Sequence, residues 1–218
     1  MGRGSSGGGD SLKGGGADKA NIKNVRDLVS MRESKRQEVD EVLTVAQYMH
    51  DEYGMDVEKF VVADLSGKDA LTMAYYDGEN IGFNSKYFNS EKMTQAYDSC
   101  AADGFHPGRG DKTAMEAIGA HEYGHAIIGQ VAGALTMSGH ASDATSVDKV
   151  TKYVVNQALK KTKQKSATKF ARNISGYATY NNGECISEAF SDVYCNGSKA
   201  KAESKAIVSV INEILGKK

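Results

Sequence analysis

The sequence has few of the features that mark membrane, secreted or nucleic-acid-binding proteins. No apolar run approaches the ~20 residues that a membrane-spanning helix needs, and the first residues lack the apolar centre of a secretory signal. The 27 basic and 28 acidic residues give a formal net charge of −1, so no global charge favours a nucleic acid or an anionic membrane. We therefore expect a cytoplasmic protein without a nucleic-acid or membrane partner.

Cysteine and proline are also scarce. The three cysteines, Cys100, Cys185 and Cys195, are odd in number and form neither a CxxC pair nor the spacing of a disulfide framework. Because free cysteine is among the most buried residue types, we interpret them as thiols that pack as small apolar residues. The only proline, Pro107, lies in the glycine-containing segment DGFHPGRGD, which indicates a loop at 103–111.

The remaining composition is that of an ordinary globular protein, with 40% hydrophobic and 25% charged residues. A chain of 218 residues without an obvious repeat is typical of one compact domain. Residues 1–20 consist mainly of glycine, serine and charged residues, with too little apolar surface to offset the entropy lost on ordering. We predict a flexible tail at 1–20 and a single domain at 21–218.

The order of the secondary-structure signals predicts an α+β fold. An amphipathic helix is expected within 24–53, and Gly54 follows it as a C-cap. The segments KFVVADL and LTMAYYD favour a hairpin at 59–77, and NIGFN at 80–84 follows as a third strand. Helical patterns then occupy 90–102, 112–132, 146–163, 182–195 and 201–215. We expect a small antiparallel sheet followed by a mainly helical part.

The segment AIGAHEYGHAIIGQVAG contains the pattern HExxH, in the residues His121, Glu122 and His125. On a helix, a spacing of four rotates the second histidine by only ~40° from the first, so both imidazoles can bind one metal ion. Glu122 would then address a water on that metal as a general base. Two imidazoles, a carboxylate and a water are the ligands of a catalytic zinc, so we expect Zn²⁺.

The third ligand is not fixed by this motif. A metzincin would have a glycine and a histidine at the positions of Ile128 and Val131, which excludes that class. His140 and Asp143 are possible ligands in a serine- and glycine-rich loop, although a loop holds a ligand less rigidly than a helix.

Three acids at 174–197 form a better set of candidates. Asn181 or Asn182 can cap a helix on which Glu184, Glu188 and Asp192 follow at spacings of four and share one face. If Glu188 is the ligand, Asp192 would orient a histidine from outside the coordination sphere, as in thermolysin-like enzymes. If Glu184 is the ligand, Glu188 would take that orienting role. Spacing alone leaves both possibilities open.

A family resemblance favours one of these two possible ligands. Tyr177, Asn181, Glu184 and the run Glu188-Ala189-Phe190, downstream of HEYGH, resemble the Y-x-x-x-N-x-x-E-x-x-x-E-A-F pattern of gluzincins related to anthrax lethal factor. Pro-Pro endopeptidases and peptidase-like domains encoded with phage head proteins share this pattern. The resemblance covers about residues 80 to 196. It implies a zincin-like fold with Glu184 as the third zinc ligand, Tyr177 facing the substrate oxygen and Glu188 as a supporting partner.

The resemblance also implies a function and a location. We expect a zinc metallopeptidase that hydrolyses a peptide or protein substrate, with Glu122 and Tyr177 as its catalytic residues and Tyr180 as the alternative to Tyr177. A structural or interaction protein of a phage head that retains the zinc site is the alternative, and a secreted effector is a third possibility. The phage relatives extend the expected location to the virion.

An extended substrate is expected to pair with an edge strand beside the active-site helix. We assign this role to Gly82, Phe83 and Asn84 in the strand NIGFN. The loop at 104–111 would form a rim, with His106 as a surface residue rather than a ligand.

Overall fold

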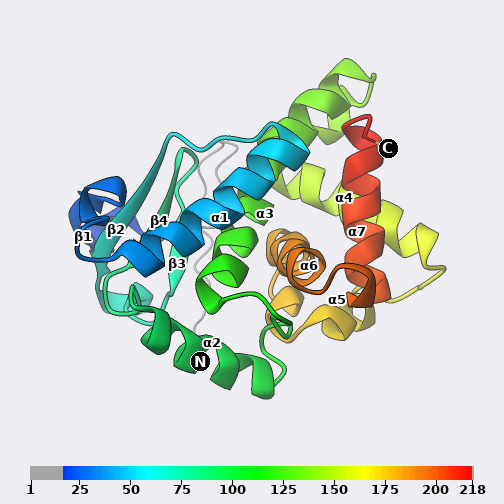
Figure 1. The fold of residues 1–218 in the computed structure, drawn as a ribbon. Coiled ribbons are helices and arrows are strands. Elements are labelled where there is room, and N and C mark those ends of the chain that lie inside the picture. The colour runs from blue at the N-terminus through cyan, green and yellow to red at the C-terminus, as the bar shows by residue number, and fades with distance from the viewer. Residues whose placement is uncertain (1–16, 218) are drawn as a thin grey trace.

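The computed structural model describes residues 17–217, so most of the predicted tail lies outside the described residues. The described part is an α+β fold in which a small sheet lies at one side of seven α-helices (Figure 1). Residues 18–20, predicted to belong to the tail, contact the rest of the fold. The backbone N–H of Asp18 donates to the carboxylate of Asp69 at 2.9 Å, and a 3₁₀ turn follows at Lys19–Asn21.

The sheet consists of β1 (Ile22–Asp27), β2 (Lys59–Leu65), β3 (Ala74–Tyr76) and β4 (Asn80–Asn84), in the order β1-β2-β4-β3. It is mixed, because β4 runs parallel to β2 and antiparallel to β3. The predictions of an antiparallel sheet and of a hairpin between β2 and β3 were therefore wrong. The hairpin that forms joins β3 to β4 through the Asp77-Gly78 turn.

Burial explains why β4 takes the inner position. Four of its five residues are buried on alternating faces, which is typical of a strand covered on both sides. Gly82 pairs with Val61 on one side and Tyr75 on the other. A Cβ at Gly82 would lie 2.1 Å from the Tyr75 ring, so the close approach of that ring requires glycine at this position.

The first helix starts later than expected. The chain from residue 24 forms the end of β1 and a 3₁₀ turn at Val29–Met31, and α1 spans Arg36–Tyr53. The apolar residues of the periodic pattern begin only at Val39, which agrees with this later start. Gly54 ends α1 in the left-handed conformation with φ of 58°, so the predicted C-cap is confirmed.

The later helices agree more closely with their patterns. They are α2 (Ser90–Ala102), α3 (Ala114–Met137), α4 (Val147–Lys161), α5 (Ala167–Ile174), α6 (Asn182–Asn196) and α7 (Ala202–Ile214). The sequence patterns did not predict α5, which has only eight residues and therefore little periodicity. Thr113 and Glu116 form a capping box at the start of α3.

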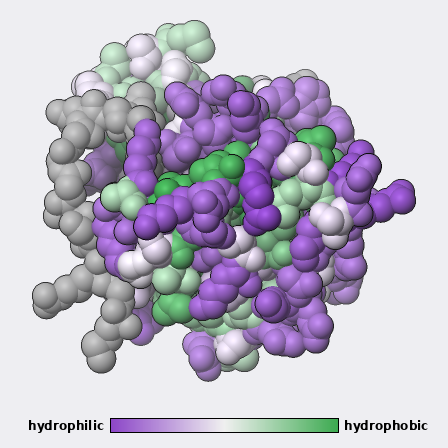
Figure 2. All heavy atoms as spheres, turned by 90° about the vertical axis from the view of Figure 1, so that its left-hand side faces the viewer, coloured by the Kyte–Doolittle hydropathy of each residue, from purple (hydrophilic) through white to green (hydrophobic). Residues whose placement is uncertain are grey.

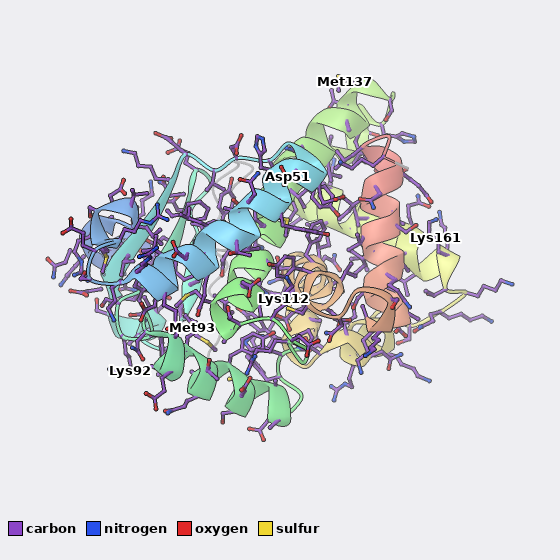
Figure 3. All side chains as sticks on the ribbon, in the orientation of Figure 1. Asp51, Lys92, Met93, Lys112, Met137 and Lys161 are labelled. Atoms are coloured by element: carbon purple, nitrogen blue, oxygen red, sulfur yellow. The ribbon has the colours of Figure 1, made fainter. Side chains whose placement is uncertain are left out.

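Helix α3 is the centre of the fold. It packs against α1, α2 and β3 on one side and against α6 on the other (Figure 1). Every residue from Ala114 to His125 is buried. From Ala126 onward α3 reaches the surface in places, and at its end Met137 is 86% exposed (Figure 3).

On the face that the sheet side presents, charged and polar residues surround small apolar areas (Figure 2). Among the described residues, none of the helices combines the length and apolar character that spanning a membrane requires.

Candidate metal centre

The centre forms where the middle of α3 crosses the first turn of α6. Gly124 makes this approach possible, because it packs against the backbone of Ser187. His121 and His125 project from α3 toward Glu184, which lies in the first turn of α6. The side chain of Asn181 accepts a hydrogen bond from the backbone N–H of Glu184 at 2.9 Å, so Asn181 is the N-cap of α6.

His121, His125 and Glu184 bring together three atoms that could bind one metal ion. The Oε2 atom of Glu184 lies 3.2 Å from Nε2 of His121 and 3.4 Å from Nε2 of His125. Two ligands about 2.0–2.1 Å from a tetrahedral zinc ion would be about 3.3 Å apart. One ligand atom from each of the three residues fits within a span of 4.8 Å. The spacing therefore fits a single small ion.

Hydrogen bonding within the centre is incomplete. Within the described part of the chain, Glu184 Oε2 is buried without a hydrogen-bond partner, although two ring nitrogens are near it. A buried acceptor without a partner is costly, and coordination of a cation would remove that cost. The two nitrogens and one carboxylate oxygen suit Zn²⁺.

The charges around the centre favour an ionised Glu184. Burial alone would raise the pKa of this carboxyl, but the adjacent His125 and His121 lower it well below its usual range. Burial would likewise lower the pKa of His121, but its contacts with Glu184 and Glu188 raise it well above the usual value. Glu184 is thus charged and available as a ligand at neutral pH.

Glu188 lies behind the centre. Its Oε1 atom accepts a hydrogen bond from Nδ1 of His121 at 2.8 Å, and its Oε2 atom accepts one from the hydroxyl of Ser175 at 2.7 Å. Burial opposes ionisation of Glu188, but His106 and His121 lower its pKa to about 2. Because a carboxylate only accepts, His121 carries its proton on Nδ1, and Nε2 is the atom that can bind a metal.

The structure separates the other candidate ligands from this centre. Asp192 accepts hydrogen bonds from the side-chain amide of Asn196 and from the backbone N–H of Lys201, so it stabilises the connection from α6 to α7. His140 is exposed and Asp143 is partly exposed, and the two side chains lie 3.8 Å from each other beyond the end of α3. Of the two readings of the acidic face, the geometry agrees with Glu184 next to the histidines and Glu188 behind them.

Comparison of the chain with profiles of known families, with curated proteins and with solved structures found no match.

Glu122 is buried beside the two histidines on α3. Desolvation raises the pKa of its carboxyl, while the charges of His121 and His125 oppose that rise. Glu122 lies outside the group of three residues that could hold a metal ion. It is therefore a buried carboxyl beside the centre that is not one of the three candidate metal ligands.

Tyr177 lies next to His121. Its ring stacks on the ring of His121, with centroids 5.7 Å apart and an angle of 15° between the planes. The side chain is only partly buried, and burial together with Glu184 and other acids raises the pKa of its hydroxyl far above the usual value. Tyr177 therefore remains a neutral donor. Tyr180, the sequence-based alternative, contacts the Tyr177 ring and is 53% exposed.

The assignment of Gly82, Phe83 and Asn84 to an edge strand was wrong. They lie in β4, whose two sides are both paired, and Gly82 and Phe83 are buried. The side chain of Asn84 donates to the carbonyl of Thr72 at 2.8 Å, so it holds the β3 connection in place. An inner strand has no free backbone groups for a peptide, which removes the basis for a substrate-binding role.

Two further residues beside the centre, His106 and Ser175, were not predicted from the sequence. His106, expected at the surface, is 6% exposed and its Nδ1 atom lies 3.0 Å from Glu188. Ser175 is also buried, at the end of α5. Both residues lie in irregular segments, where no periodicity predicts which side chain points inward.

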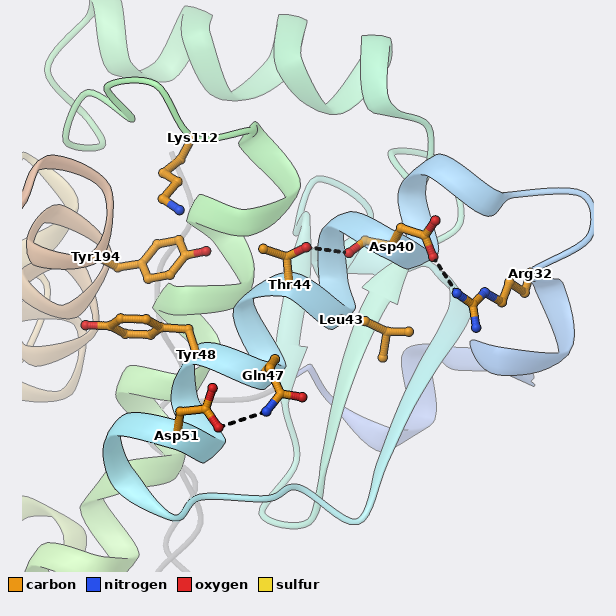
Figure 4. Close-up of a pocket in the computed structure, with 9 residues that line it drawn as sticks. All are labelled: Arg32, Asp40, Leu43, Thr44, Gln47, Tyr48, Asp51, Lys112 and Tyr194. Carbon is orange, nitrogen blue, oxygen red and sulfur yellow. Dashed lines mark hydrogen bonds and ion pairs between the residues drawn. The ribbon is translucent and has the colours of Figure 1, made fainter.

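A broad hollow of about 630 Å³ lies apart from the centre (Figure 4). Residues of α1 form most of its wall, and Tyr48 meets the ring of Tyr194 at 5.0 Å. Its charged groups are of both signs, with Arg32 bound to Asp40 at 3.0 Å and Lys112 near Tyr194. None of the three candidate metal ligands lines this hollow.

Proposed function

We propose that this protein is a zinc-dependent endopeptidase. The observation that carries the proposal is the convergence of His121 Nε2, His125 Nε2 and Glu184 Oε2, with 3.2 Å and 3.4 Å from the carboxylate oxygen to the two rings. Three protein ligands leave one position of a tetrahedral ion open, which is the arrangement of catalytic zinc rather than of structural zinc. The arrangement also agrees with the gluzincin pattern in the sequence.

A bound Zn²⁺ would supply Lewis acidity and a water whose pKa is lowered to ~7. His121, His125 and Glu184 would hold the ion, and Glu188 would keep His121 in the required tautomer.

Glu122 is the proposed general base. It follows His121 directly on α3, and its carboxyl is not used as a metal ligand. Burial raises its pKa, which makes the carboxylate a better proton acceptor than an exposed one. It takes the proton of the attacking water and passes it to the leaving amine of the peptide bond.

Tyr177 is the proposed donor to the oxygen that becomes negative during attack. Its raised pKa keeps the hydroxyl protonated, so it can donate throughout the reaction. Stacking on Phe105 at 5.0 Å and on His121 at 5.7 Å fixes the ring at the edge of the centre. Such a fixed donor stabilises charge as it develops in the transition state.

The substrate is a peptide or protein bound in an extended form. Within the described sheet, β3 is an edge strand, since only β4 pairs with it, and it packs against α3. We assign the backbone pairing with substrate to Ala74–Tyr76 in place of β4.

The test combines metal analysis with peptide hydrolysis. The purified protein should contain about one zinc ion and cleave members of a peptide library, and the variant Glu122→Gln should keep the zinc and lose the cleavage. If both proteins bind zinc and neither cleaves any peptide, the phage-head structural role becomes the better proposal. A parent protein that binds no zinc would refute both.

A further inference from the structure

Three donors from three segments of the chain converge on the carboxylate of Glu188. Its Oε1 atom lies 2.8 Å from Nδ1 of His121 and 3.0 Å from Nδ1 of His106, and its Oε2 atom accepts from the hydroxyl of Ser175 at 2.7 Å. Glu188 is only 1% exposed, so these contacts replace the hydration that the carboxylate loses on burial. Because the carboxylate can only accept, both rings must donate from Nδ1.

The ring of His106 is fixed independently of Glu188. It stacks on the ring of Tyr97 with centroids 5.3 Å apart and an angle of 7° between the planes. Tyr97 in turn donates its hydroxyl hydrogen to the carbonyl of Pro107 at 3.0 Å, which ties the loop to α2. The donor of His106 therefore has a defined direction.

The backbone also fixes the loop of His106 against the centre. The N–H groups of Gly176 and Tyr177 donate to the carbonyls of Gly104 and Phe105 at 2.8 Å and 3.0 Å. These two bonds hold the residues just before His106 beside the segment that carries Ser175 and Tyr177. The loop is thus part of the support of the centre.

We propose that His106 is a positioning residue of the metal centre. Its Nδ1–H fixes the carboxylate of Glu188, and Glu188 then fixes the ring of His121 with Nε2 directed at the metal. Without His106, one bond to Glu188 Oε1 is lost, and only His121 and Ser175 still hold the carboxylate, so its position relative to His121 is less well defined. This inference rests on the zinc site of the proposed function but not on its peptidase activity.

The test compares two substitutions at one position. His106→Leu replaces the ring with an apolar side chain and removes the donor, whereas His106→Asn keeps an N–H donor near the position of ring Nδ1. Loss of a partner that supports a metal ligand typically weakens metal affinity by about 10- to 100-fold. We expect His106→Leu to weaken zinc binding within this range and His106→Asn to recover most of the loss, as measured by competition with a chromogenic zinc chelator.

Tyr97→Phe is the matched control, because it removes a hydrogen bond from the same loop without changing a donor to Glu188. It keeps the ring that stacks on His106, so it should lower the melting temperature of the metal-free protein and weaken zinc binding much less than His106→Leu does. The inference is overturned if His106→Leu binds zinc as tightly as the parent, or if Tyr97→Phe weakens binding equally. A parent protein that binds no zinc would instead overturn the zinc site on which the inference rests.

A second measurement does not require a folded His106→Leu variant or metal. In long-range ¹H–¹⁵N spectra of the metal-free parent, His106 should be protonated at Nδ1, with slow exchange of that proton. Exchange should accelerate at least about tenfold in Glu188→Ala, since the acceptor is gone. Unchanged exchange would show that Glu188 does not hold the His106 ring and would overturn the inference.

Discussion

Gly124 of α3 lies so close to Ser187 of α6 that a Cβ at Gly124 would come within 2.5 Å of the Ser187 Cα. Gly124 directly precedes His125 on α3, and Ser187 lies three residues after Glu184 on α6. The distance between the two helices therefore sets the distance between the histidines and the carboxylate.

Gly124→Ala should push α3 and α6 apart. Overpacking of this kind typically costs about 1–3 kcal/mol in the free energy of unfolding, which denaturant unfolding of the metal-free protein measures. Zinc affinity should fall as well, because Glu184 moves with α6.

Gly129→Ala is the matched control, since it lies on the same helix and its Cβ would have no neighbour within 4 Å. It should stabilise the protein by about 0.5–1 kcal/mol, because alanine favours a helix over glycine. Equal effects at the two positions would contradict the packing argument.

Removing one acid at a time should separate the roles of the acidic face of α6. Glu184→Ala should abolish stoichiometric zinc binding, because it removes a ligand. Glu188→Ala should weaken zinc binding by about 10- to 100-fold, because it only orients His121. Asp192→Ala should leave zinc binding intact and lower the melting temperature, because Asp192 bonds to Asn196 and to the backbone of Lys201. Zinc content and melting curves check all three. Zinc retained in Glu184→Ala but lost in Glu188→Ala would reverse the assigned roles.

The hydroxyl of Tyr177 should affect turnover without affecting metal binding. Loss of one donor to a developing oxyanion commonly lowers kcat by about 100-fold or more. Tyr177→Phe keeps the ring that stacks on His121, so zinc affinity and KM should change little. Steady-state hydrolysis of a peptide cleaved by the parent gives both constants. Tyr180→Phe is the control, and a comparable fall in its kcat would transfer the proposed role to Tyr180.

Glu116 should make stability depend on pH outside the metal centre. Burial opposes its ionisation, but the N–H of Thr113, the hydroxyl of Tyr194 and Lys112 lower its pKa overall. A pKa that is lower in the folded state adds stability above the unfolded value of ~4.3, and this stability is lost as the pH falls through the folded pKa.

Glu116→Gln should therefore be less stable than the parent at pH 7, and the difference should shrink as the pH is lowered below ~4.3. Denaturant unfolding of both proteins between pH 7 and pH 3 provides the measurement. Glu33→Gln, at an exposed acid, should show a much smaller dependence on pH. A difference at Glu116 that is constant with pH would assign its effect to packing and capping alone.

Local sequence determined the features that repeat along one element. The spacing of His121 and His125 on a helix, the C-cap at Gly54 and the N-cap at Asn181 all depend on residues within a few positions of one another. The α+β class and most helix limits could be predicted for the same reason. The pattern Tyr177, Asn181, Glu184 and Glu188 also predicted, through a family resemblance, which acid lies next to the histidines.

Only the tertiary structure decided how distant segments meet. The strand order depends on which strand is buried on both faces. For this reason β4, predicted at the edge of the sheet, lies in its interior. Asp192 continues the spacing of Glu184 and Glu188, but its carboxylate accepts a hydrogen bond from the backbone N–H of Lys201 at the start of α7. His106 lies in a loop without periodicity, and backbone pairing with Gly176 and Tyr177 carries it to Glu188. Local patterns fix the direction of a side chain relative to its own helix, whereas packing between elements fixes what that side chain meets.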